Sequence, residues 1–292
     1  MVKYNPKVWF SLIFHNYSKQ VMRTLLPALL FTVIFTILVA FTFDYFNIDN
    51  SVFPATIGMH SLLGIVLGLF LVFRTNSAYD RWWEGRKLWG SMVNSTRNLA
   101  LKLNAYLSKE DHESRLWFAN MISNFVFASK EHLRKGVLLH ELSQSDETFL
   151  EKLKNYKHKP NHIASLLFSK TNELYKAKLI TGDQLINTDK ELKDFMDIVG
   201  ACERIKFTPI PYSYSMYIKK FIFIYIVTLP FAFVTTYSYF TMIIVAIITF
   251  VLLSIELIAE EIEDPFGKDI NDLPTDELAI KIKENIEEIL LA

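Results

Sequence analysis

The sequence predicts an all-α integral membrane protein with four transmembrane helices and a cytoplasmic helical domain. About half of its 292 residues are apolar (51%) and only 21% are charged, which is unusual for a soluble chain of this length. The apolar residues gather in long stretches that contain no charged side chain. No alternating apolar and polar pattern of useful length indicates a β-strand.

Two uncharged stretches near the start of the chain each have the length of one membrane span. Residues 24–43 are 20 uncharged positions, which rise about 30 Å as a helix and match the hydrocarbon core of a bilayer. The second stretch covers residues 50–73 and is closed by Arg74. Pro54 lies where its helix is expected to begin.

A third uncharged stretch is too long for a single span. Residues 221–255 are 35 uncharged positions, which would rise about 52 Å as one helix and exceed an ordinary bilayer. The segment is therefore expected to fold back on itself. The polar cluster at 235–239 is the expected turn, and Pro230 lies in the first of the two resulting spans.

Positive charge flanks the spans on one side only. Lys and Arg precede the first span, follow the second and precede the third, whereas the segment between the first two spans has Asp44 and Asp49 and no Lys or Arg. Cationic segments stay in the cytoplasm, so both termini are expected there. The expected order is a cytoplasmic segment 1–23, spans one and two in 24–74, a cytoplasmic helical domain 75–216, spans three and four in 217–257, and a cytoplasmic segment 258–292.

The cytoplasmic domain is expected to consist of helices and one surface loop. Residues 77–107 contain few helix breakers and would continue the second span as one long helix. Residues 112–135 and 183–207 have apolar positions at helical spacing, and the latter helix is expected to end before Pro209. Residues 138–161 are charged and aperiodic, which predicts a loop.

The residue types disfavour an enzyme, a coupled transporter and a metalloprotein. Cys202 is the only cysteine, the histidines show no metal-ligand spacing and no nucleophile motif is present, so no cofactor is expected. Within the spans, His60 is the only conventional group that titrates near neutral pH. It could line a passage, but a satisfied group at a span end is the commoner role. Basic and acidic residues both number 31, so no charge excess suggests nucleic acid as a partner.

The second span carries two features at helical spacing. Gly64 and Gly68 form a G-x-x-x-G pair, which lets another helix approach closely. Ile65, Leu69 and Phe73 repeat every fourth residue and form an apolar row about 12 Å long. The commonest role of such a row is helix packing. Alternatively, several copies around an axis would form a dry constriction that gates a pore by dewetting.

A series of motifs runs along the chain: LLGI at 62–65, FRTNS at 73–77, YDRWWE at 79–84, RKLWG at 86–90, CERI at 202–205, TPIP at 208–211, AEEIEDPFG at 259–267 and NDLP at 271–274. In this order they resemble the bestrophins, and specifically bacterial bestrophin homologues. The resemblance implies a homopentamer in the bacterial inner membrane that passes small monovalent ions through one central pore. It also implies that Ile65, Leu69 and Phe73 form a hydrophobic neck and that Ile205 forms a cytoplasmic aperture.

Two departures from the animal members bear on ion chemistry. Animal bestrophins follow Pro-Phe-Gly with an unbroken acidic run that helps to bind Ca2+, whereas only Asp269 and Asp272 remain here. Ca2+ prefers six to eight oxygen ligands, so this clasp is degenerate and we expect no calcium gating through it. The middle neck position is Leu69 where animal members have an aromatic residue, whose ring edge can favour anions, so this departure leaves the ion selectivity open. Because animal bestrophins are chloride channels, we expect anions such as chloride to pass.

Two other hypotheses remain open at this stage. A channel of the same architecture would instead select cations. A membrane scaffold or accessory subunit would use the apolar row and the glycines only for helix packing and would not conduct. In each case the expected partners are the lipid bilayer and further copies of the chain.

Overall fold

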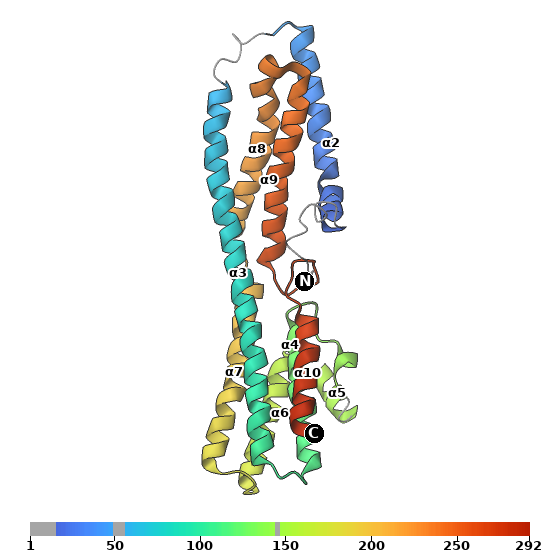
Figure 1. Ribbon diagram of the computed structural model, residues 1–292, viewed down its shortest axis with the longest axis vertical. Coiled ribbons are helices and arrows are strands. Elements are labelled where there is room, and N and C mark those ends of the chain that lie inside the picture. Colours follow the sequence, from blue (N-terminus) through green and yellow to red (C-terminus); the bar gives the residue numbers. More distant parts are fainter. Residues whose placement is uncertain (1–15, 49–55, 144–146) are drawn as a thin grey trace. The chain divides into compact units, whose positions relative to one another are not determined.

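The computed structural model describes residues 16–48, 56–143 and 147–292, which form helices joined by short connections (Figure 1). No strand occurs in these ranges, in agreement with the predicted all-α class. Pro54 and most of the segment 1–23 lie outside them. The chain divides into a first unit, Met1–Arg81 with Pro209–Glu263, and a second unit, Trp82–Thr208 with Asp264–Ala292.

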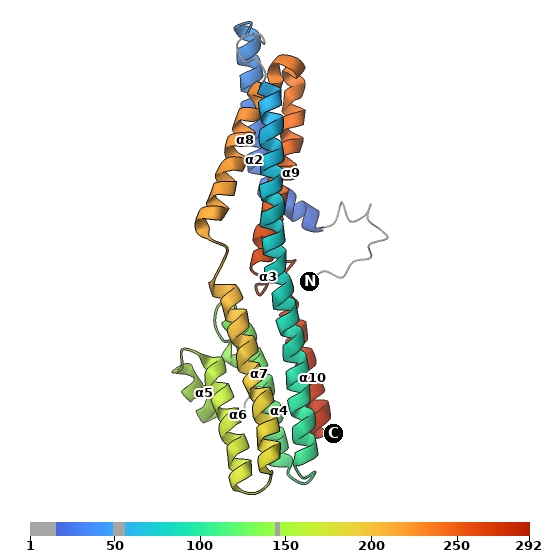
Figure 2. The same cartoon turned by 90° about the vertical axis from the view of Figure 1, so that its left-hand side faces the viewer.

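The first unit contains the apolar helices: α2 (Asn16–Tyr45), the first part of α3 (Thr56–Tyr106), α8 (Tyr212–Tyr237) and α9 (Thr241–Glu263). Helix α2 packs against α8 and α9, which also pack against each other (Figure 2). The chain turns between α8 and α9 at Ser238, whose φ is +46°. The turn expected at 235–239 is therefore confirmed.

Three helical stretches of the described residues are long and apolar enough to cross a membrane. They are Val21–Tyr45, Ile57–Tyr106 and Tyr212–Glu263. The third contains both α8 and α9 together with the turn between them. Each of these two helices has more than the ~20 residues that one crossing requires.

The second unit is a helical domain with its own apolar core. It contains the rest of α3 together with α4 (His112–His132), α5 (Glu147–Lys154), α6 (Lys159–Lys176), α7 (Gly182–Phe207) and α10 (Thr275–Leu291), and the 3-10 turn η2 (Leu139–Glu141). Phe118, Phe125 and Phe195 are fully buried in this core. The continuation of α3 past residue 77 is confirmed, as are the helices expected at 112–135 and 183–207.

The prediction of a loop at 138–161 is wrong. This segment contains η2, α5 and the start of α6. Helix α5 is short but places Leu153 in the core without solvent exposure. Helix α6 begins at a defined cap, because the His158 side chain accepts a hydrogen bond from the Asn161 amide and Pro160 occupies the first turn.

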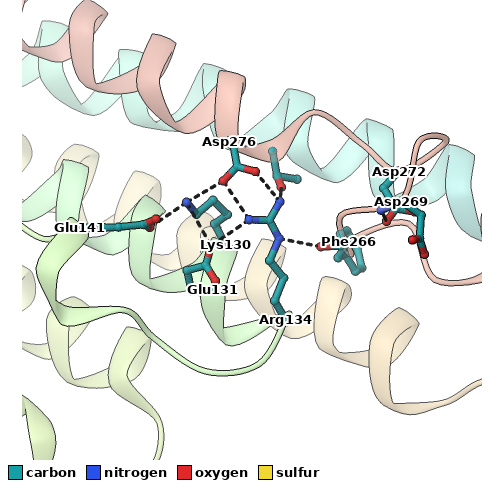
Figure 3. A network of polar contacts seen from close by, with 9 residues as sticks. Lys130, Glu131, Arg134, Glu141, Phe266, Asp269, Asp272 and Asp276 are labelled. Carbon is teal, nitrogen blue, oxygen red and sulfur yellow. Dashed lines mark hydrogen bonds and ion pairs between the residues drawn. The ribbon is translucent and has the colours of Figure 1, made fainter. Parts of the chain in front are cut away.

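A cluster of charged side chains joins α4 to α10 (Figure 3). The Lys130 ammonium contacts Glu131, Glu141 and Asp276 at 2.8–3.1 Å. The Arg134 guanidinium donates to both carboxylate oxygens of Asp276, each at 2.8 Å. Burial alone would lower the pKa of Lys130, but its three carboxylate partners outweigh burial and raise that pKa. Hydrogen bonds from Arg134 and then Lys130 hold the pKa of Asp276 well below its usual range.

We predict that Asp276→Asn destabilises the protein by about 1–2 kcal/mol at neutral pH, because it removes the carboxylate that pairs with Lys130 and Arg134. The loss is modest because this half-exposed carboxylate is partly screened by solvent. The pKa of Asp276 is lower in the folded protein than in the unfolded chain. Its carboxylate therefore stabilises the protein fully at pH values above the unfolded pKa of about 3.9, and this contribution disappears as the pH falls toward the folded pKa. The difference between wild type and variant should therefore shrink below about pH 4. Denaturant unfolding of purified protein measures it.

The control for this prediction is Asp197→Asn, which removes the carboxylate of the exposed Lys193–Asp197 pair. Exposed pairs contribute little, so this variant should unfold like wild type. Equal stability of wild type and Asp276→Asn at neutral pH would contradict the role given to Asp276.

Candidate functional site

The apolar row on α3 is exposed in the subunit, whereas the opposite side of the same helix is buried. Ile65, Leu69 and Phe73 are 70%, 56% and 54% exposed. Leu67 and Leu71 pack against α8 and α9 and are almost fully buried. Helix α3 therefore attaches to its own subunit through one side and leaves the row free to meet water, lipid or another copy of the chain.

The two glycines of the second span have different surroundings. A Cβ atom at Gly64 would lie 2.8 Å from the Tyr225 hydroxyl of α8, so the absence of a side chain permits this close approach. A Cβ atom at Gly68 would meet nothing within 4 Å in the described part of the chain. Of these two glycines, Gly64 alone makes a close contact with another helix in the described part of the subunit.

We predict that Gly64→Val destabilises the subunit by roughly 1–3 kcal/mol, because the larger side chain overpacks the contact with Tyr225. Gly68→Val is the matched variant on the same helix and should fold like wild type. Thermal unfolding in detergent compares the two. Equal destabilisation by both would contradict the difference between the two positions.

Arg74 ends the apolar part of α3 and is almost completely buried, at 1% exposure. Its Nη2 lies 2.7 Å from Glu263 Oε2, and its Nε lies 3.7 Å from Glu256 Oε1. The latter distance gives an ion pair without a hydrogen bond. The sequence indicates the position of Arg74 at the end of a span but does not reveal that two carboxylates of α9 share its burial.

Glu263 connects three parts of the first unit. One carboxylate oxygen accepts the hydrogen bond from Arg74 on α3, and the other accepts from the Ile210 amide that precedes α8, at 2.9 Å. Its carbonyl accepts from Arg81 Nε at 3.0 Å. The last residue of α9 therefore fixes α3 and the start of α8.

His60 faces α8 in the structure. Its Nε2 lies 3.0 Å from the Thr228 hydroxyl, and its ring lies beside that of Tyr225 with centroids 5.8 Å apart. These contacts favour packing between α3 and α8 over the lining of a passage.

The cytoplasmic aperture role that the resemblance implies for Ile205 stays a prediction. This residue of α7 is 4% exposed and belongs to the apolar core of the second unit, together with Cys202 and Phe266. Within its own subunit, Ile205 is therefore a core residue.

The two aspartates of the degenerate clasp lie in the loop between α9 and α10 (Figure 3). Asp272 is buried, and its Oδ2 accepts a hydrogen bond from the Asp269 amide at 2.6 Å. A Cβ atom at Gly267 would lie 2.6 Å from the same oxygen, so the loop closes over a glycine. One oxygen of Asp272 thus already holds the loop together. The absence of calcium gating remains a prediction.

Comparisons with known proteins agree on one family. The model of the Bacterial/Fungal Bestrophin protein family matches residues 1–288. A voltage-dependent anion channel-forming protein of a Nostoc species is 40% identical over 77% of this chain and 75% of its own, and one of a Synechocystis species is 33% identical over 98% and 93%. A bacterial bestrophin homologue from Klebsiella pneumoniae superposes with a TM-score of 0.84 at 27% identity, covering 91% of this chain and 99% of that chain.

Proposed function

The chain belongs to the bacterial and fungal bestrophin family, and we propose that it forms a homopentameric channel that conducts anions such as chloride across the bacterial inner membrane. The names of the Nostoc and Synechocystis relatives as voltage-dependent anion channel-forming proteins support the choice of anions. In this proposal α2, the first part of α3, α8 and α9 cross the bilayer, and both termini lie in the cytoplasm.

The observation that carries the proposal is the exposed apolar row on α3. Ile65, Leu69 and Phe73 remain exposed while the opposite side of the helix is buried against α8 and α9. Five copies around an axis would bring these side chains together as a neck of three apolar rings. Such a neck excludes water when narrow and gates ions by wetting and drying. The cytoplasmic aperture at Ile205, which the resemblance implies, belongs to the same proposal.

We predict that the purified protein in planar bilayers conducts ions, and that under a KCl gradient its reversal potential moves toward the chloride equilibrium potential. The sign of the reversal potential identifies the permeant ion directly. A shift toward the potassium equilibrium potential would replace the anion channel by a cation channel of the same architecture. Gel filtration of the same sample in detergent measures the number of copies.

A scaffold without conductance is the alternative from a different class. It requires an intact oligomer that carries no current in any monovalent salt, with neck substitutions that break the oligomer apart. Current from the intact oligomer would exclude it.

A further inference from the structure

Two histidines and a glutamate from three different helices meet in the second unit. His132 is the last residue of α4, His158 is the cap residue of α6, and Glu203 lies in α7. Both histidine Nε2 atoms lie 2.7 Å from the same oxygen, Glu203 Oε1. The two rings lie side by side with centroids 4.4 Å apart. The side chains are only partly exposed, at 17%, 30% and 25%.

This arrangement matches what one divalent transition-metal ion requires. One ligand atom from each residue lies within 4.8 Å of the other two, so a single ion can reach all three. Zn2+ binds imidazole nitrogen and carboxylate oxygen at about 2.0–2.2 Å in tetrahedral geometry. Three protein ligands leave the fourth position for water, which the partial exposure of the cluster permits.

We propose that His132, His158 and Glu203 bind Zn2+, or a divalent transition metal of similar ligand preference, and that the ion fastens α4, α6 and α7 together. The sequence does not show this site, because its ligands lie far apart in the chain and have no motif spacing. The proposal does not depend on ion conduction, since all three ligands belong to the second unit.

The hydrogen bond that caps α6 lowers the affinity of the site for a metal ion, because metal binding breaks it. His158 Nδ1 accepts a hydrogen bond from the Asn161 amide at 3.1 Å, so the ring proton lies on Nε2. Coordination through Nε2 moves that proton to Nδ1 and gives up the cap. The loss of one cap corresponds to roughly a tenfold loss in affinity, which a site with two further ligands can sustain.

Calorimetric titration of the full-length oligomer with ZnCl2 tests the site, after chelator treatment and removal of the chelator. We expect one Zn2+ per chain. His158→Asn is the most informative variant, because asparagine caps a helix as well as any residue. The substitution therefore removes the metal ligand but keeps the cap of α6. His158→Asn and Glu203→Gln, each as a single variant, should weaken Zn2+ binding at least about 100-fold. The loss of a residue that only orients a metal ligand weakens binding less than this.

His140→Ala is the matched control, because His140 is an exposed histidine of the same unit and lies outside the cluster. It should bind Zn2+ like wild type. Replacing Zn2+ by Co2+ gives a second readout, since tetrahedral Co2+ has strong visible absorption that His158→Asn should abolish. Wild-type binding below one ion per chain, or equal binding by wild type and a His158→Asn oligomer that elutes normally, would overturn the proposal.

Discussion

Leu69→Ala is expected to increase the current through the assembled protein by about tenfold or more. The reason is the hydrophobicity of the middle ring. Replacing leucine by alanine removes three carbon atoms from each subunit's part of the ring. Each methylene contributes about 0.8 kcal/mol to the free energy of transfer from water to an apolar environment. A fall of only about 1.4 kcal/mol in the barrier increases the rate of passage tenfold. A smaller ring thus stays wet for longer and passes more ions.

The matched control is Leu38→Ala on α2. Leu38 is a leucine of nearly the same exposure, 58% against 56%, on another helix of the same unit. If exposure to lipid explains both positions, the two variants should behave alike. If Leu69 lines a neck, only Leu69→Ala should change the single-channel current or the open probability. Unchanged current in Leu69→Ala, with a normal oligomer in gel filtration, would contradict the neck.

The two sides of α3 perform separate tasks in this scheme. Leu67 and Leu71 hold the helix against its own subunit, so substitutions there are expected to affect folding. Ile65 and Leu69 do not contribute to that packing, and substitutions there should leave the subunit intact. Conductance and stability can therefore be changed independently along one helix, which makes the neck testable by mutation.

The local features of the fold could be predicted from the sequence where a single physical rule decided them. The turn at Ser238 follows from a charge-free stretch too long for one span, and the end of α7 follows from Pro209. Helix α5 could not be predicted in this way, because eight residues are too few to show a period. Burial of Leu153 against the core stabilises it instead.

In the candidate site, too, the sequence predicts some features, whereas others depend on packing between distant residues. The exposed row on α3 can be read from a four-residue spacing, but the burial of Ile205 depends on packing within the second unit, which position in a motif does not report. The partners of Arg74 lie more than 180 residues away in α9. Contacts of this kind depend on how α3 and α9 meet in the fold.

The largest expected loss of stability is that of Arg74→Met, at roughly 3–5 kcal/mol. Methionine is shorter than arginine but is unbranched and fills most of its volume, so the main effect is electrostatic. The variant leaves Glu256 and Glu263 buried without their cation, at side-chain exposures of 7% and 15%. An uncompensated buried carboxylate is far more costly than the complete ion pair. Unfolding in mixed detergent micelles, with gel filtration of the oligomer, measures the effect.

A compensated variant separates charge from shape. Arg74→Met combined with Glu256→Leu and Glu263→Gln removes the whole charge cluster, and the glutamine can still accept the hydrogen bond from the Ile210 amide. Replacing a buried ion pair by apolar groups of similar volume is often neutral, so this variant should recover most of the lost stability. Equal stability of Arg74→Met and wild type would mean that water or protons neutralise the two carboxylates. A triple variant as unstable as the single one would instead assign the loss to packing.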